Sequence, residues 1–307
     1  MAGQILVVGS SNTDMVVKTE KLPAPGETVL GGTFLMNPGG KGANQAVAAA
    51  RLAGKGTGSP VTLVAKVGND LFGEQAIRQF EQEGIRTDYL AIDPETPSGV
   101  ALINVDTQGE NTITVASGAN ANLQPSEADA ALEATAPDTI VLLQLEIPLE
   151  TVEHVIRRSY EQGLRVILNP APARPLPFGL YPFLYLLTPN ETEAGLLTHI
   201  AVTDEETAGI AARRLRELGA ANVIITLGSK GVYLHTEDTS TLIPAPDVIA
   251  LDTTAAGDCF NGALAVALSE GMTLPDAAAF ACQAAALSVT RMGAQASMPT
   301  REELKRN

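Results

Sequence analysis

The feature that most constrains the fold is an alternation of short apolar runs with longer runs of helical spacing, from about residue 125 onward. Strands are predicted at 139–143, 164–168, 183–187 and 223–226, with helices at 126–134, 150–162, 191–197, 204–218, 258–269 and 275–290. Consecutive parallel strands need a helical crossover between them, so this order predicts a mostly parallel sheet. Strands at 4–8 and 61–67 and a helix at 71–84 extend the pattern toward the N-terminus. The expected fold class is α/β.

Two segments break this alternation because they contain strand-like runs without an intervening helix. Short strands are predicted at 15–17, 28–30 and 33–36, and a hairpin with strands at 98–105 and 111–117. We expect the two segments to join in one small sheet, which would act as a lid over a ligand site on the main sheet. The predicted organisation is one α/β domain over residues 1–307 with a discontinuous lid from 14–38 and 98–120.

The stretch 251–264 combines small residues with a carboxylate at the start of an apolar helix. Ala255, Ala256 and Gly257 would let a phosphate approach the free N–H groups of the first turn, where the helix dipole also favours negative charge. Asp258, in that same turn, can accept a proton from a hydroxyl that attacks the phosphate. The alternative is an ordinary helix start with an acidic first turn.

Polar residues also follow several predicted strands, at the edge where open parallel sheets bind ligands. Asn12 and Asp14 suit vicinal hydroxyls, although both side chains could instead bond their own backbone in a turn. Lys41 and Asn44 lie in a glycine-rich run that lacks the spacing of a P-loop, and both can reach a polar ligand. Further polar strand ends stand at 144–146, 169–170, 190–193 and 226–231.

The charge of the chain argues against some classes of partner. Lys and Arg number 20 against 35 Asp and Glu, a net charge of −15, which disfavours nucleic acid and anionic membranes. Cys259 and Cys282 stand in apolar helical contexts and are expected to be buried free thiols. No run approaches the ~18 apolar residues of a membrane span, and the N-terminus lacks the pattern of a signal peptide. We therefore expect a cytoplasmic protein without a membrane partner.

Three motifs, at 39–44, 190–193 and 252–258, resemble in their order and separation those of the ribokinase family of carbohydrate kinases. The resemblance covers essentially the whole chain, through residues 290–295. Ala255 stands where the wider family commonly has glycine, and a backbone N–H donor survives either choice. The resemblance implies a three-layer α/β/α sandwich, a β lid that also forms a homodimer interface, and ATP-dependent phosphorylation of a sugar hydroxymethyl group.

The resemblance also implies a role for individual positions. Asp258 matches the catalytic base, and the N–H groups of Ala255, Ala256, Gly257 and Asp258 match the anion hole. The sugar-contacting positions are Asn12, Asp14, Gly40, Lys41, Gly42, Asn44 and Glu146. Asn190 and Glu193 match the motif that orders Mg²⁺ and phosphates through water. The adenine-nucleotide loop corresponds to Thr226, Gly228, Ser229 and Gly231, with Gly257 beside it. A monovalent-cation site, for K⁺, corresponds to Asp252, Thr254, Ser288, Arg291, Gly293 and Ser297.

The resemblance implies D-ribose as acceptor and leaves 2-deoxyribose, fructose or another ketose, and a nucleoside as alternatives. A nucleoside would need an apolar or aromatic shelf, and the chain has no Trp, 5 Tyr and 7 Phe. A catalytically idle binding protein is disfavoured because Gly257 and Asp258 are both present, and an NAD-dependent dehydrogenase because Gly9 begins no G-x-G-x-x-G. Cys259, next to the expected base, suggests sensitivity to thiol reagents.

Overall fold

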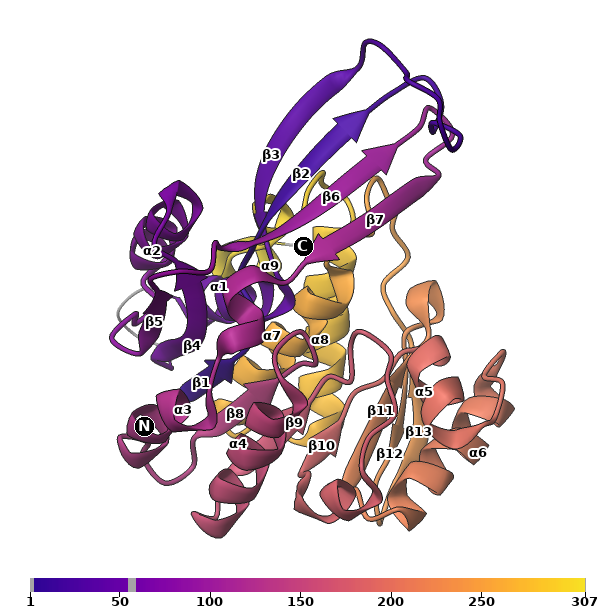
Figure 1. Cartoon of the computed structure of the whole chain (residues 1–307). Helices are drawn as coiled ribbons and strands as arrows, with labels where there is room; N and C mark the ends of the chain where they lie inside the picture. Colours follow the sequence, from indigo (N-terminus) through magenta and orange to yellow (C-terminus); the bar gives the residue numbers. More distant parts are fainter. Residues whose placement is uncertain (1–2, 55–58, 307) are drawn as a thin grey trace.

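The structure, a computed structural model, describes residues 3–54 and 59–306. Within these residues the central sheet has nine strands, in the order β13–β12–β11–β10–β9–β8–β1–β4–β5 (Figure 1). Their bounds are β1 (Ile5–Val8), β4 (Val61–Gly68), β5 (Leu90–Asp93), β8 (Ile140–Leu143), β9 (Arg165–Leu168), β10 (Leu186–Leu187), β11 (Asn222–Thr226), β12 (Val232–His235) and β13 (Ser240–Ile243). The strands from β11 to β5 run parallel, and β12 and β13 add an antiparallel hairpin at one edge.

Helices cover both faces of this sheet, because successive side chains of each strand point to opposite sides. Ile5 and Val7 join one core, and Leu6 and Val8 join the other. The first core contains residues of α1 (Lys41–Ala53), α2 (Leu71–Glu83), α7 (Ala256–Ser269), α8 (Leu274–Ser288) and α9 (Arg301–Leu304). The second contains α3 (Pro125–Glu133), α4 (Leu149–Glu161), α5 (Glu191–Thr198) and α6 (Glu205–Glu217). The predicted α/β class and its three-layer arrangement are confirmed.

The lid is a separate sheet made of β2 (Asn12–Lys18), β3 (Thr33–Gly39), β6 (Gly99–Val105) and β7 (Asn111–Ala116). Its order is β3–β2–β6–β7, and the parallel pair β2–β6 joins the two segments that lie far apart in the sequence. Figure 1 shows the lid projecting beyond the end of the sandwich, above α7 and α8. The two strand-rich segments therefore do form one sheet, as predicted.

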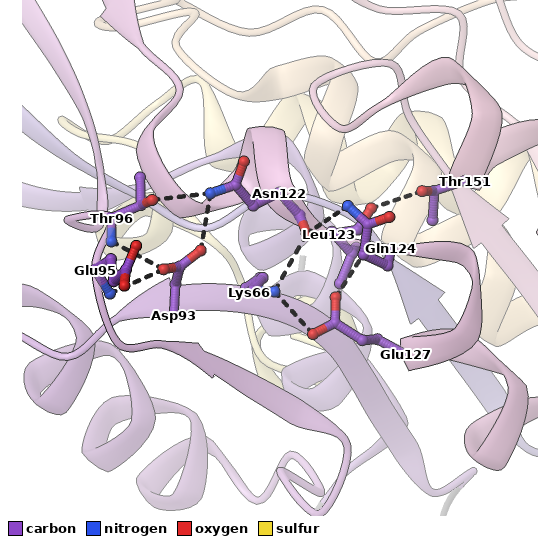
Figure 2. Close-up of polar contacts among 9 residues, drawn as sticks. All are labelled: Lys66, Asp93, Glu95, Thr96, Asn122, Leu123, Gln124, Glu127 and Thr151. Atoms are coloured by element: carbon purple, nitrogen blue, oxygen red, sulfur yellow. Dashed lines mark hydrogen bonds and ion pairs between the residues drawn. The ribbon is translucent and has the colours of Figure 1, made fainter.

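A polar cluster anchors the base of the lid (Figure 2). Asn122, just after β7, donates from Nδ2 to Asp93 Oδ2 and Thr96 Oγ1, both at 2.8 Å, and so ties the two stems of the β6–β7 hairpin together. Lys66 of β4 bonds the carbonyl of Asn122 at 3.2 Å and pairs with Glu127 at 2.9 Å. The hydrogen bonds from Asn122 and from backbone N–H groups lower the pKa of Asp93 to about 2, so this carboxylate stays ionised.

Two local predictions were wrong or incomplete, and two short elements were not predicted. Residues 28–30 form no strand, since they lie in an exposed connection next to Gly31 and Gly32, which both have positive φ. The strand predicted at 183–187 is reduced to Leu186–Leu187, because Phe178–Phe183 is a 3₁₀ helix. Strand β5 and helix α9 were not predicted, since four residues are too few to show a period. Over the described part of the chain, no helix has the length and apolarity to cross a membrane.

Helices α1 and α7 pack closely, and this contact positions the site described below. A Cβ atom added at Gly262 of α7 would lie 2.6 Å from the carbonyl oxygen of Gln45 and 2.7 Å from the Cβ of Ala48, both on α1. The alanine-rich face of α1 and the glycine of α7 therefore let the two backbones approach. This approach brings Asn44 and Gln45 within hydrogen-bonding distance of Asp258.

Replacing Gly262 with alanine should therefore strain this contact. We expect Gly262→Ala to lower the free energy of unfolding by about 1–3 kcal/mol, the usual cost of overpacking. The measurement is chemical denaturation. The matched control is Gly179→Ala, at a glycine with open space around its added Cβ. Equal stability of the two variants would contradict the close approach.

Candidate active site

A cavity of about 710 Å³ lies between the lid and the sandwich. It opens where the strand order reverses: β1 has β4 as its neighbour on one side and β8 on the other. In α/β folds, ligands bind at such switch points. From the sandwich side the cavity is lined by Gly40, Lys41, Asn44, Glu146 and Asp258. The lid contributes Asn12 and Asp14 of β2 and the apolar side chains of Ala101, Ile103, Ile113 and Val115. Six of the seven expected sugar-contacting positions therefore surround one space, together with Asp258.

The seventh position, Gly42, does not line the cavity. A Cβ atom at Gly42 would lie 2.5 Å from the amide nitrogen of Ser10. Its role in the structure is thus to let the start of α1 pack against the turn that follows β1.

Asp258 is the third residue of α7 and is buried against α1. Asn44 donates to its Oδ2 at 2.9 Å, and Gln45 donates to its Oδ1 at 3.0 Å. Burial raises the pKa of Asp258, Lys41 and the two amides oppose that rise, and Glu146 adds to it. The carboxylate is thus held at both oxygens, at the wall of the cavity.

Lys41 supplies a positive charge to the wall of the cavity, which Arg174 also lines. Burial alone would lower its pKa, but the carboxylates of Asp258, Glu146, Glu193 and Asp14 reverse this effect and raise it. Lys41 therefore stays protonated at neutral pH.

Glu146 is fixed at the N-terminus of α1. Its Oε2 accepts from the Ser10 hydroxyl at 2.6 Å and from the Lys41 backbone N–H at 3.0 Å. An anion is stabilised at this end of a helix by the unpaired N–H groups and the dipole.

Asp14 and Asn12 stand side by side at the start of β2. Burial raises the pKa of Asp14 to about 6, with further contributions from Glu146 and Asp258. Asp14 lies directly over Gly39, where an added Cβ would come within 2.3 Å of both carboxylate oxygens. Asn12 is held by Asn120, which donates to its Oδ1 at 2.8 Å. The two side chains offer hydrogen-bonding groups to vicinal hydroxyls.

A second cavity, of about 440 Å³, lies on the other side of the first turn of α7. It is lined by Thr226, Gly228, Ser229 and Gly231, as the resemblance implied, and by Ala256, Gly257 and the apolar side chains of Val232, Phe260 and Cys282. Ala255 and Asp258 face the first cavity, so one turn of helix separates the two spaces.

This turn presents backbone N–H groups to an anion. Ala255, at φ 59°, precedes the helix in the left-handed conformation and turns the chain into it. The Ala256 N–H donates to the carbonyl of Thr253 at 3.2 Å, so it is engaged within the loop. The N–H groups of Gly257 and Asp258 belong to the first turn, where a helix offers no acceptor of its own. Gly257 and Asp258 therefore each offer a backbone N–H that could donate to an anion.

Asn190 and Glu193 line neither cavity. Asn190 caps α5 by accepting from the Glu193 N–H at 2.8 Å, and Glu193 Oε2 accepts from the Asn190 N–H at 2.9 Å. A bridge between Asn190 and Thr226 places this cap at the edge of the second cavity. Burial raises the pKa of Glu193. The cap uses Oε2 of this carboxylate, so Oε1 could contact a water molecule of a hydrated divalent cation.

The positions expected around a monovalent cation lie close together behind the first turn of α7. Asp252 accepts from the N–H groups of Thr254 at 2.9 Å and Gly293 at 2.8 Å. The Asp252 N–H bonds the carbonyl of Val289, the neighbour of Ser288, at 3.1 Å. The Arg291 guanidinium pairs with Glu303 at 2.7 Å, and because a guanidinium has no acceptor atom, only the backbone carbonyl of Arg291 could contact a cation. Ser297 is buried in the 3₁₀ turn that follows. Carboxylate, carbonyl and hydroxyl oxygens of this kind suit a hard cation.

The thiol hypothesis for Cys259 is not supported by its environment. Its side chain is fully buried, and burial raises the pKa of the thiol to about 12. Cys282 is also buried, with its pKa raised to about 12. A reactive cysteine needs access and a lowered pKa, so neither thiol should react readily.

Sequence reasoning missed three residues that position the site. Gln45 directly follows Asn44 in the glycine-rich run, and this adjacency to an expected site residue was the one sequence signal for it. Asn120 and Ser10 carry no comparable signal, because their partners Asn12 and Glu146 meet them only in the folded chain.

Comparison with known proteins agrees with this geometry. A family model described as pfkB family carbohydrate kinase matches residues 2–301. The chain is 44% identical over 301 residues to a ribokinase of Bacillus subtilis, with 98% of each protein covered. It is 40% identical to a deoxyribokinase of Salmonella typhi, over 97% of this chain and 96% of that protein.

A solved structure extends the comparison to three dimensions. The structure of Arabidopsis thaliana ribokinase complexed with ribose and ATP matches with a TM-score of 0.89 and 33% identity, covering 100% of this chain and 98% of that one. The motifs, the two cavities and the full-length match lead to one conclusion. The chain belongs to the pfkB family of carbohydrate kinases.

Proposed function

We propose that this chain transfers the γ-phosphoryl group of ATP to the 5-hydroxyl of D-ribose. The observation that carries the proposal is the position of the first turn of α7, which separates a polar cavity from a second cavity and carries Asp258 between them. Phosphoryl transfer needs an acceptor and a donor on either side of an anion-binding site, with a base on the acceptor side. The match to the Arabidopsis ribokinase complexed with ribose and ATP supports both substrates.

In this mechanism the sugar lies in the first cavity, where Asn12, Asp14 and Lys41 bond its hydroxyls. Asp258 takes the proton of the 5-hydroxyl as that oxygen forms its bond to the γ-phosphorus. The bond from phosphorus to the β–γ bridging oxygen breaks, and ADP leaves with the electron pair. The N–H groups of Gly257 and Asp258 stabilise the charge on the transferring group.

The nucleotide would occupy the second cavity, with its base against the apolar walls and its phosphates toward α7. Asn190 and Glu193 would order Mg²⁺ through water, and the ion would neutralise charge on the phosphates. The use of ATP is in keeping with the expected cytoplasmic location.

We propose that a monovalent cation binds in the loop around Asp252 and Thr254. The family resemblance implies that this cation is K⁺. The donor chemistry of this loop supports the assignment. Because Thr254 directly precedes the anion-binding turn, an ion there would fix the conformation of Ala255 and the N–H groups that follow.

The lid supports two further roles. Cross-strand partners share a face of a sheet. The face with Ala101, Ile103, Ile113 and Val115 lines the sugar cavity, so closure of the lid would exclude water from it. The opposite face carries Phe34, Met36 and Leu102, which are exposed by 46–59%. We propose that this apolar face contributes to a homodimer formed through the lids.

The acceptor is the least constrained part of the proposal. The relative named deoxyribokinase favours 2-deoxyribose as the second candidate, because it is nearly as similar to this chain as the ribokinases are. Fructose, another ketose and a nucleoside are weaker alternatives. Sugars that differ by one hydroxyl are separated only where a buried side chain requires that hydroxyl as a partner.

An ADP-release assay tests the function directly. With ATP and Mg²⁺, we expect kcat/KM for ribose to exceed that for 2-deoxyribose, fructose and adenosine, and to fall when Na⁺ replaces K⁺. Higher turnover of another acceptor would keep the mechanism and change the substrate. No turnover with any of them would remove the kinase proposal.

The variant Asp258→Asn tests the base. We expect kcat to fall by at least ~10²–10⁴-fold, the usual contribution of a general base, with the fold intact by circular dichroism. The matched control is Asp276→Asn, the same change at the third residue of α8, which is exposed. A variant at Asp258 that kept most of its activity would exclude this residue as the base.

The pKa of Asp14 predicts a pH dependence of sugar binding. A raised pKa means that the carboxylate is ionised above about pH 6 and protonated below it. Protonation removes acceptors from the sugar hydroxyls, so the Kd for ribose should increase about tenfold between pH 7.5 and pH 5. Calorimetry measures this dependence, and Asp14→Asn should bind ribose more weakly with a flatter profile. An equally steep profile in the variant would assign the titration to another group.

A further inference from the structure

Gln45 is a fully buried polar side chain that the mechanism above does not use. It lies on α1 next to Asn44 and does not line the sugar cavity. Its Nε2 donates one hydrogen bond to Asp258 Oδ1 at 3.0 Å and a second to Asn169 Oδ1 at 3.1 Å. A buried amide with both of its hydrogens engaged has one well-defined orientation.

That orientation is determined by a backbone carbonyl. Asn169, which follows β9, donates from Nδ2 to the carbonyl of Thr188 at 3.0 Å. A carbonyl can only accept, so Asn169 must direct its own oxygen toward Gln45. Gln45 must then direct its NH₂ group toward Asn169 and Asp258.

A second neighbour completes the support of Gln45. Gln144, which follows β8, donates from Nε2 to Gln45 Oε1 at 2.6 Å. The polar residues after two adjacent parallel strands, β8 and β9, thus converge on a single amide. They are strand-end residues for which the proposed function gives no role.

The same hydrogen-bond network also contacts α7, the helix that carries Asp258. Thr188 donates from its hydroxyl to Asn261 Oδ1 at 2.6 Å, and Asn261 donates to the carbonyl of Gly257 at 2.8 Å. A closed chain of hydrogen bonds therefore links both sides of the first turn of α7. A carboxylate held in this way has little freedom to rotate.

We propose that Gln45 is a positioning residue, which keeps the Asp258 carboxylate ionised and oriented toward the acceptor hydroxyl. The inference rests on the proposed function, in which Asp258 is the base. Asn44 bonds the other oxygen but also lines the sugar cavity, whereas Gln45 bonds Asp258 without lining that cavity. Its loss should therefore change proton transfer and leave sugar binding intact.

Several charged groups face Asp258 and set the background for this effect. Lys41 of α1 favours the ionised form, and Glu146, Asp14 and Glu193 oppose it. Gln45 adds a neutral donor to this set. Removing a hydrogen bond from a buried carboxylate disfavours ionisation, so the pKa of Asp258 should rise.

The test is the pH profile of kcat for Gln45→Met, which keeps the length of the side chain and removes the donor. We expect the acid limb to move up by about 1–2 pH units, with activity recovering at high pH and the KM for ribose nearly unchanged. The control is Thr151→Val, which removes a buried hydrogen bond of 2.6 Å from the Thr151 hydroxyl to the Leu123 carbonyl. This bond lies beside the polar cluster around Asn122 and does not involve Asp258 (Figure 2). The control variant should leave the limb in place.

The alternative outcomes are distinct. A uniform loss of kcat at every pH, or an unshifted limb, would overturn the proposal. If Gln45→Met does not fold, the variant Gln144→Met provides the test. It removes the hydrogen bond to Gln45 Oε1, so the Gln45 amide is held less firmly and the acid limb of kcat should move up by a smaller amount. An unshifted acid limb in Gln144→Met would also overturn the proposal. Failure of the base itself is recognised separately, because Asp258→Asn would then stay active.

Discussion

A buried carboxylate next to a helix N-terminus is the constraint on which the rest of this structure depends. Burial disfavours the charged form of Asp258, and the fold opposes that cost with two amide donors and the ammonium group of Lys41. All three of these groups come from α1. The close packing of α1 on α7 at Gly262 is therefore a condition for the chemistry as well as for stability.

The surrounding architecture places the helix turn that carries this carboxylate between two different cavities. The switch point of the sheet opens one cavity beside Asp258, and the loop after β11 contributes to a second cavity on the other side of the first turn of α7. The lid covers the first cavity with apolar side chains, which suits a reaction that must exclude water. The stems of its β6–β7 hairpin are tied to the sandwich by Asn122 and Lys66.

The electrostatic arrangement also separates the roles of the acidic residues. Glu146 is bonded to the start of α1, Glu193 caps α5, and Asp252 joins two loops behind the anion-binding turn. Asp14 lines the cavity, and its pKa of about 6 means that its charge changes just below neutral pH. A strongly acidic chain can thus bind an anionic nucleotide, because the groups that would meet the phosphates are backbone N–H donors.

The sequence by itself determined the features that depend on neighbouring residues. The α/β class, most strands and helices, the small-residue start of α7 and the polar strand ends are local patterns of period and composition. These patterns predicted the two-segment lid sheet, and the family resemblance named seven expected sugar-contacting positions, of which six line one cavity. The four-residue elements β5 and α9 are too short to show a period.

Only the tertiary structure decided which side chains meet. Gln45 reaches Asp258 across 213 residues and Asn120 reaches Asn12 across 108, and such contacts depend on how helices and strands pack, which no local pattern encodes.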